Sequence, residues 1–176
     1  MKCESTLGKA VMQHLVLSVV FAMSLAPLSQ AETATALSAD SLEIVAGDDW
    51  TGTLTYLNYG EPLRDFTIPA ELQVEVIERG LRLNYKYPEE PKENSSVTAR
   101  ISADGTKLMG APIVANRVLD AGEREVITRY PCNDMGQTAT CETILTLSQN
   151  EFRSRKMVTY EGESDAFRRN EYVFTR

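Results

Sequence analysis

The feature that most constrains this chain is an alternation of apolar and polar residues with a period of two, which starts at Trp50. Trp50, Gly52, Leu54 and Tyr56 fall on one face of such a segment, and three threonines fall on the other. This pattern indicates β-strands with one buried face and one wet face. It recurs in segments 72–76, 81–87, 97–101, 112–119, 124–130, 139–148, 151–161 and 169–176. The sequence therefore predicts about eight to ten short strands.

Turn residues separate these segments at short intervals, at 78–80, 104–105, 121–122 and 148–150. Tight turns join antiparallel neighbours, and no segment is long enough for the helical crossover that parallel strands need. An antiparallel meander with one apolar face buries that face and its edges by closing on itself. The prediction is an all-β, antiparallel up-and-down barrel. A two-sheet sandwich is the alternative, although it needs long Greek-key connections and the sequence has few.

A short N-terminal helix is expected just before the first strand. Ser38 or Asp40 can cap it, the segment 42–45 gives it an apolar side, and Gly47 ends it. Within the first strand, Gly52 is expected to allow a bend or the close approach of another strand. Residues 41–176 form one predicted domain, and the small, polar residues 32–40 form a loose leader.

The segment 1–31 has the pattern of a secretory signal peptide. Lys2 and Lys9 precede an apolar core at 15–28, and Ser29 and Ala31 are small residues at the positions that a signal peptidase reads. A membrane anchor is the alternative, but the apolar run is short for a membrane span. We expect cleavage after Ala31 and export to the periplasm or the extracellular space, with no stable membrane insertion afterwards.

Loss of this segment also changes the chemistry available to the chain. The one histidine, His14, leaves with it, and so do Lys2, Lys9 and Glu4, which leaves 16 basic and 24 acidic residues and a net charge of −8. This acidity argues against a nucleic acid partner. Without histidine, Ser–His–Asp and Cys–His catalysis and histidine-bound zinc are excluded. We expect no metal site, no cofactor and no catalytic residues, and an enzyme is the least favoured reading.

Cys132 and Cys141 are the two cysteines that remain after the predicted cleavage. In an oxidising compartment an isolated pair of this kind is usually a disulfide. A metal or redox pair is the alternative, but soft metal ligands are otherwise lacking and the spacing differs from Cys-x-x-Cys. We therefore predict a structural disulfide between them.

The pattern resembles the lipocalin-like barrels of the calycin superfamily. A short helical lead-in precedes Gly47-Asp48-Asp49-Trp50, a meander of strands follows, and the chain ends in an arginine-bearing strand at 168–176. In such barrels an arginine from a late strand packs on the tryptophan and closes the barrel bottom. The resemblance therefore implies a cation–π contact between Trp50 and either Arg169 or Arg176. Relatives that bind haem hold iron through histidine, so that activity is not carried over.

Four tyrosines lie in phase with apolar neighbours on their predicted strands: Tyr56, Tyr85, Tyr87 and Tyr130. A few polar groups on an apolar wall are typical of ligand pockets. We therefore regard these four residues as candidates for lining a ligand cavity. The alternative is a packed core whose tyrosines reach the barrel rim.

Arg117 shares the period-two face of Ile113, Ala115 and Leu119. If that face points inward, Arg117 is an interior charge that needs a partner, such as a lipid carboxylate or a buried glutamate. The opposite register places Val114 and Val118 inside and Arg117 in water. The alternation alone leaves both registers open.

Three classes of function follow from these patterns. The favoured one is an exported barrel that binds an apolar or amphipathic, lipid-like small molecule. The second is a packed barrel that acts through its surface on a protein partner or in envelope assembly, without a ligand. The third is an enzyme that works without histidine.

Overall fold

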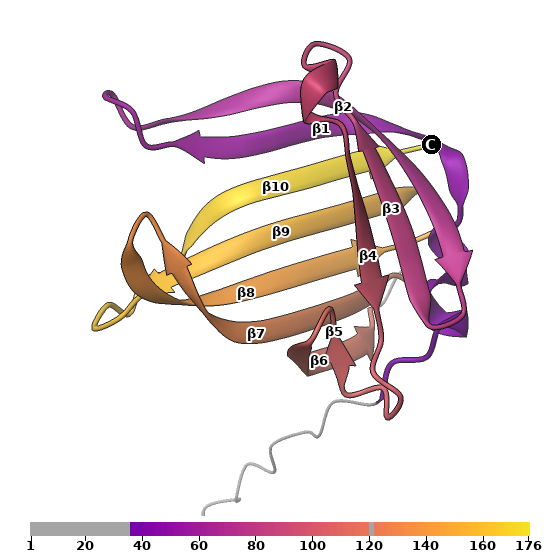
Figure 1. The fold of residues 1–176 in the computed structure, drawn as a ribbon. Coiled ribbons are helices and arrows are strands. Elements are labelled where there is room, and N and C mark those ends of the chain that lie inside the picture. Colours follow the sequence, from indigo (N-terminus) through magenta and orange to yellow (C-terminus); the bar gives the residue numbers. More distant parts are fainter. Residues whose placement is uncertain (1–35, 120–121) are drawn as a thin grey trace, which may run out of the picture. The chain divides into compact units, whose positions relative to one another are not determined.

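The computed structural model describes residues 36–119 and 122–176, so the predicted signal peptide and residues 32–35 of the leader lie outside the described residues. Ten strands form one sheet in the order β4-β3-β2-β1-β10-β9-β8-β7-β6-β5 (Figure 1). The elements are the 3-10 helices η1 (Asp40–Val45) and η2 (Pro91–Glu93) and the strands β1 (Gly47–Asn58), β2 (Arg64–Ile77), β3 (Gly80–Lys86), β4 (Ser95–Arg100), β5 (Lys107–Leu108), β6 (Ala111–Val118), β7 (Arg124–Asp134), β8 (Gln137–Leu147), β9 (Glu151–Tyr160) and β10 (Phe167–Thr175).

Every pair of neighbouring strands is antiparallel, and nearly all neighbours are consecutive in the chain. The exception is β1, which pairs with β10 from Thr51 opposite Thr175 to Tyr56 opposite Asn170. The first and last strands therefore join two runs of the meander into one curved sheet. The predicted all-β up-and-down barrel is confirmed.

The barrel is nearly closed, and its seam lies between β4 and β6 (Figure 1). Only the two-residue strand β5 links these edges. Leu108 forms an isolated bridge with Ile101 beyond β4, and it also pairs with Ala111 of β6. Met109 and Gly110 both have positive φ, at 54° and 83°, which turns the chain sharply at this point. The tight turn leaves most of the β4 and β6 edges without a strand between them.

Gly52 lies at a close contact between β1 and β10. A Cβ atom at this position would lie 1.9 Å from the carbonyl oxygen of Val173. Only glycine allows this approach, as the sequence indicated. The contact brings β10 against the first strand and places Phe174 opposite Gly52.

The N-terminal helix is η1, a 3-10 helix whose buried residues are Leu42 and Val45. Ile44 is 41 % exposed, and no side chain caps the helix, so the expected cap at Ser38 or Asp40 is wrong. The Ser38 hydroxyl instead pairs with that of Ser41 at 2.7 Å. Leu37, in the predicted loose leader, is buried, and its amide donates to the Gly105 carbonyl at 2.9 Å. This part of the leader therefore packs on the barrel.

Candidate functional site

One end of the barrel is closed by an apolar plug around Trp50. The indole is 1 % exposed and packs edge-on against Phe152, which packs in the same way against the buried Phe174. Its Nε1 donates to the carbonyl of Val45 in η1 at 3.0 Å. The helix therefore caps this end, and the ring's one polar atom is satisfied inside the plug.

Arg176 lies over the Trp50 ring, with its guanidinium carbon 4.2 Å from the ring centroid. Its three nitrogens donate to the carbonyls of Ile44, Ala46 and Gln149 at 2.7–2.9 Å. A single arginine thus ties the end of β10 to η1 and to the β8–β9 turn. Of the two arginines that the resemblance offered for this contact, the structure places Arg176 on the tryptophan.

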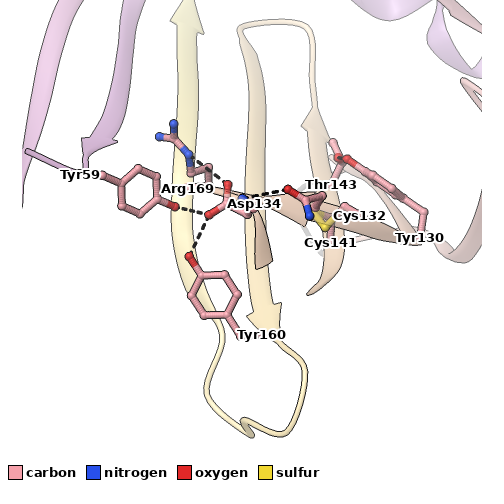
Figure 2. Close-up of a disulfide and its surroundings, with 10 residues drawn as sticks. Tyr59, Tyr130, Cys132, Asp134, Cys141, Thr143, Tyr160 and Arg169 are labelled. Atoms are coloured by element: carbon pink, nitrogen blue, oxygen red, sulfur yellow. Dashed lines mark hydrogen bonds and ion pairs between the residues drawn. A yellow bond between two sulfur atoms is a disulfide. The ribbon is translucent and has the colours of Figure 1, made fainter. Parts of the chain in front are cut away.

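Arg169 lies near the other end of β10, in a polar group with Tyr59, Asp134 and Tyr160 (Figure 2). Its guanidinium carbon is 4.6 Å from the centroid of the Tyr59 ring, and its Nε is 3.4 Å from Asp134 Oδ1. Asp134 Oδ2 accepts hydrogen bonds from the hydroxyls of Tyr59 and Tyr160. Burial and the hydrogen bond to Asp134 hold the pKa of Tyr59 well above its usual value. This group joins the β1–β2 loop to the end of β7, across β10, β9 and β8 in the sheet.

An interior cavity of about 710 Å³ opens inside the barrel, behind the seam. This volume lies within the range of small-molecule sites. The apolar part of the lining comes from β3, β4, the β5–β6 turn, β7 and β8: Leu83, Tyr85, Val97, Ala99, Leu108, Met109, Gly110, Ala111, Pro112, Tyr130, Pro131 and Leu145. The polar part comes from β7 to β10: Thr128, Thr143, Ser154, Lys156 and Asn170. β3, β4 and the β5–β6 turn thus form an apolar wall, and the five polar groups of β7 to β10 form a polar wall that also carries Tyr130, Pro131 and Leu145.

The polar wall follows from the register of four neighbouring strands. Thr128 of β7 lies opposite Thr143 of β8, which lies opposite Lys156 of β9, which lies opposite Asn170 of β10. Residues opposite each other in antiparallel strands point to the same face of the sheet. Four hydrogen-bonding side chains therefore form one inward row across the barrel.

Two of the four candidate tyrosines line the cavity and two do not. Tyr85 and Tyr130 line the cavity. Tyr87 is buried beside it, and its hydroxyl pairs with that of Tyr172 at 2.8 Å. Tyr56 lies outside the lining and stacks on Phe66, with ring centroids 6.1 Å apart. Alternation alone does not separate them, because it gives the face of a residue and not its height in the barrel.

Two tyrosines form an aromatic wall at the cavity: Tyr85 lines it, and Tyr172 packs against Tyr85. The hydroxyls of both have raised pKa values. Burial raises the pKa of the Tyr85 hydroxyl well above its usual value, and the neighbouring Tyr87 raises it further. Burial and the hydrogen bond with Tyr87 likewise raise the pKa of Tyr172. The rings of Tyr85 and Tyr172 are in contact, with centroids 4.8 Å apart. Both therefore stay neutral at physiological pH.

Arg117 lies on the outside of the barrel and does not line the cavity. Its side chain is 62 % exposed, and its Nε donates to Glu125 Oε1 at 2.8 Å. Neither predicted register holds along the whole strand, because the pairing shifts at a bulge between Ile113 and Ala115. An extra residue reverses the alternation beyond it, so Asn116 is buried while Arg117 is exposed.

Lys156 is the residue that sequence reasoning missed. It follows Phe152 and precedes Val158 on the same period-two face of β9, and both of those residues are fully buried. This phase was the available signal for an inward lysine. Its outward neighbour Arg155 donates to Glu171 at 2.6 Å, whereas no hydrogen bond or ion pair joins Lys156 to another side chain in the described part of the chain.

The arginines on the outer face of β9 and β10 pair with Glu171, so they are not candidates for binding a ligand. The buried carboxylate of Glu171 accepts from Arg153, Arg155 and Arg168. Burial alone would raise the pKa of Glu171, but the hydrogen bonds and charges of these arginines outweigh it and hold the pKa below its usual value. The outer charges are thus paired with one another.

Cys132 of β7 and Cys141 of β8 form a disulfide with a Cα–Cα distance of 5.8 Å (Figure 2). Tyr130, which lies opposite Cys141, lines the cavity. The bridge therefore holds together the two strands that carry Tyr130 and Thr143.

Within residues 36–119 and 122–176, no cluster of three or more acidic, cysteine or histidine side chains is placed to hold a metal ion. The helices of the described part are too short or too polar to span a membrane. No protein-family model matches the chain, and no curated protein matches it. The cavity is therefore the feature of this protein that points to a function.

Proposed function

We propose that this protein is exported and binds an apolar or amphipathic, lipid-like small molecule inside its barrel. The observation that carries the proposal is the cavity of about 710 Å³ inside the barrel. Its volume and its apolar lining with a few polar groups are typical of small-molecule sites.

The way the interior is filled supports a binding role over a purely structural one. Side chains fill the Trp50 end completely, with Phe152 and Phe174 almost fully buried. The same strands, β9 and β10, carry Ser154, Lys156 and Asn170 at the cavity. Well-packed cores leave few voids larger than a water molecule. A space of this size beside a complete core is therefore better explained by a ligand.

Export is supported by the disulfide and by the signal-like sequence at 1–31. Disulfides of structural type persist in oxidising compartments. A carrier or sensor in such a compartment meets apolar molecules that water dissolves poorly.

The test is binding of Nile red, a neutral apolar dye, to protein produced from the full-length sequence and purified without detergent. We expect saturable binding and a blue-shifted emission. Val97→Trp, which fills the cavity from β4, should weaken binding at least tenfold. The matched control is Thr98→Trp, because Thr98 is the next residue on β4 and is exposed. That variant should bind like the wild type.

Three outcomes decide the proposal. Loss of binding in Val97→Trp alone supports it, provided that circular dichroism shows the same sheet content. If Val97→Trp does not fold, Ser154→Leu fills the cavity from β9 and replaces it. Equal binding by both tryptophan variants, or no saturable binding by the wild type, would overturn the cavity as the site and favour a barrel that acts through its surface.

A further inference from the structure

The cavity contains one charged side chain among its seventeen lining residues, and that side chain is Lys156. No aspartate or glutamate belongs to the lining. Every fully buried side-chain nitrogen and oxygen among the described residues has a hydrogen-bond partner. Lys156 has no such partner among them and is half-buried, so its ammonium is not fully buried, and its side chain lines the cavity without an ion pair.

The surroundings of Lys156 supply hydrogen bonds but no negative charge. Thr143 and Asn170 lie directly opposite it on β8 and β10, and both line the cavity. The nearest residues along the inward face of β9 are Ser154, which is neutral, and Val158, which is buried. A cation held beside apolar walls is costly unless a counter-charge meets it. The site therefore lacks one component, a negative charge.

We infer that the ligand is an amphiphile with a carboxylate head group, which pairs with Lys156 while its apolar tail lies against Leu83, Val97 and Leu145. This inference rests on the proposed function. A carboxylate has two oxygens, so one can accept from the Lys156 ammonium and the other from the Thr143 hydroxyl or the Asn170 amide. One lysine balances one carboxylate charge, whereas a phosphate monoester carries more charge than this site neutralises.

The experiment measures displacement of Nile red by laurate and by dodecanol, which share a tail and differ in the charged head. For the wild type, we expect laurate to bind at least tenfold more tightly than dodecanol, because hydrogen bonds to charged groups are the stronger kind. Lys156→Met keeps most of the length of the side chain and removes the ammonium with its charge. It should abolish the preference for laurate and leave the affinity for dodecanol within about twofold.

The matched control is Lys86→Met, because Lys86 is exposed on β3 and makes no ion pair within the described residues. It should retain the full preference for laurate. If Lys156→Met fails to fold, Lys156→Gln provides the same test with a neutral polar side chain. Dodecyl phosphate is the third competitor, and the inference expects it to bind more weakly than laurate.

The outcomes separate this inference from the function on which it rests. Equal affinities for laurate and dodecanol, or a preference that survives Lys156→Met, would overturn the carboxylate head group while cavity binding stands. Tighter binding of dodecyl phosphate than of laurate would replace the carboxylate with a phosphate. Failure of the wild type to bind Nile red and all three C12 ligands would overturn both proposals together.

Discussion

An arginine packs on an aromatic ring near each end of the barrel, in surroundings of opposite polarity. Arg176 lies over Trp50 at one end, and Arg169 lies over Tyr59 at the other. The first pair is backed by the buried rings of Phe152 and Phe174, and the second by the carboxylate of Asp134 and the hydroxyl of Tyr160. The stability of the fold is therefore expected to depend mostly on the apolar end at Trp50. At the polar end, hydrogen bonds to Asp134 position the side chains.

Two strands carry this difference along their length. β9 places Phe152 in the plug and Lys156 in the cavity, and β10 places Phe174 in the plug and Asn170 in the cavity. The backbone pairing is continuous between them apart from a register shift at 168–170. The core of this barrel and its candidate site therefore differ in their inward side chains and not in their architecture.

Trp50→Ala should have the largest effect on stability. We expect the free energy of unfolding to fall by about 3–5 kcal/mol, because a fully buried indole leaves a cavity that the plug cannot refill. Urea denaturation followed by circular dichroism measures it. A loss below about 1 kcal/mol would contradict the assignment of this end as the main core.

Removal of the disulfide by the double substitution Cys132→Ala, Cys141→Ala should lower the free energy of unfolding by about 2–3 kcal/mol, since it releases a short loop in the unfolded chain. Reduction of the wild type with dithiothreitol should lower the free energy of unfolding by the same amount and shift the denaturation midpoint downward accordingly. An unchanged midpoint in both cases would mean that the β7–β8 pairing does not depend on the bridge.

Alkaline pH should destabilise the aromatic wall. Folding raises the pKa of Tyr85 and Tyr172, so the folded state favours their neutral form. Their contribution is complete below the unfolded pKa of about 10 and is lost as the pH rises from there toward the folded values, by about 1.4 kcal/mol per pH unit for each tyrosine. Urea titrations at pH 9, 10 and 11 measure the slope. Tyr85→Phe should remove the share of one tyrosine, about 1.4 kcal/mol per pH unit above pH 10, and an identical slope in that variant would contradict the assignment.

Tyr59→Phe tests the polar end. The variant keeps the ring beneath Arg169 and removes the hydroxyl that donates to Asp134. Because Asp134 retains Tyr160 and Arg169, we expect a loss of about 1 kcal/mol, well below that of Trp50→Ala. The same denaturation experiment measures it. A loss as large as that of Trp50→Ala would erase the difference between the two ends.

Lys156→Met should have the smallest effect on stability, within about 1 kcal/mol and toward stabilisation, because it removes a half-buried charge that lacks a partner among the described residues. Its effect belongs to ligand binding. Thermal unfolding without ligand measures the change. A loss above about 2 kcal/mol would show that Lys156 supports the fold itself.

Much of the fold could be predicted because its signals are local. Period-two alternation and turn residues are properties of neighbouring positions, and they place Trp50 on the dry face of β1 and join antiparallel neighbours. The pairing of Cys132 with Cys141 follows from the two cysteines that remain after the predicted cleavage and from the expected export. The site was less predictable, since Arg117 and Arg169 each lie close to a register shift that alternation does not reveal.

The sequence by itself determined the class of this fold and the inward face of most strands, because each depends on the chemistry of a few adjacent residues. Only the tertiary structure decided which arginine meets Trp50, which tyrosines reach the cavity and that Lys156 stands there opposite Thr143 and Asn170. These facts depend on the register between strands distant in the chain, and a bulge of one residue is enough to reverse them.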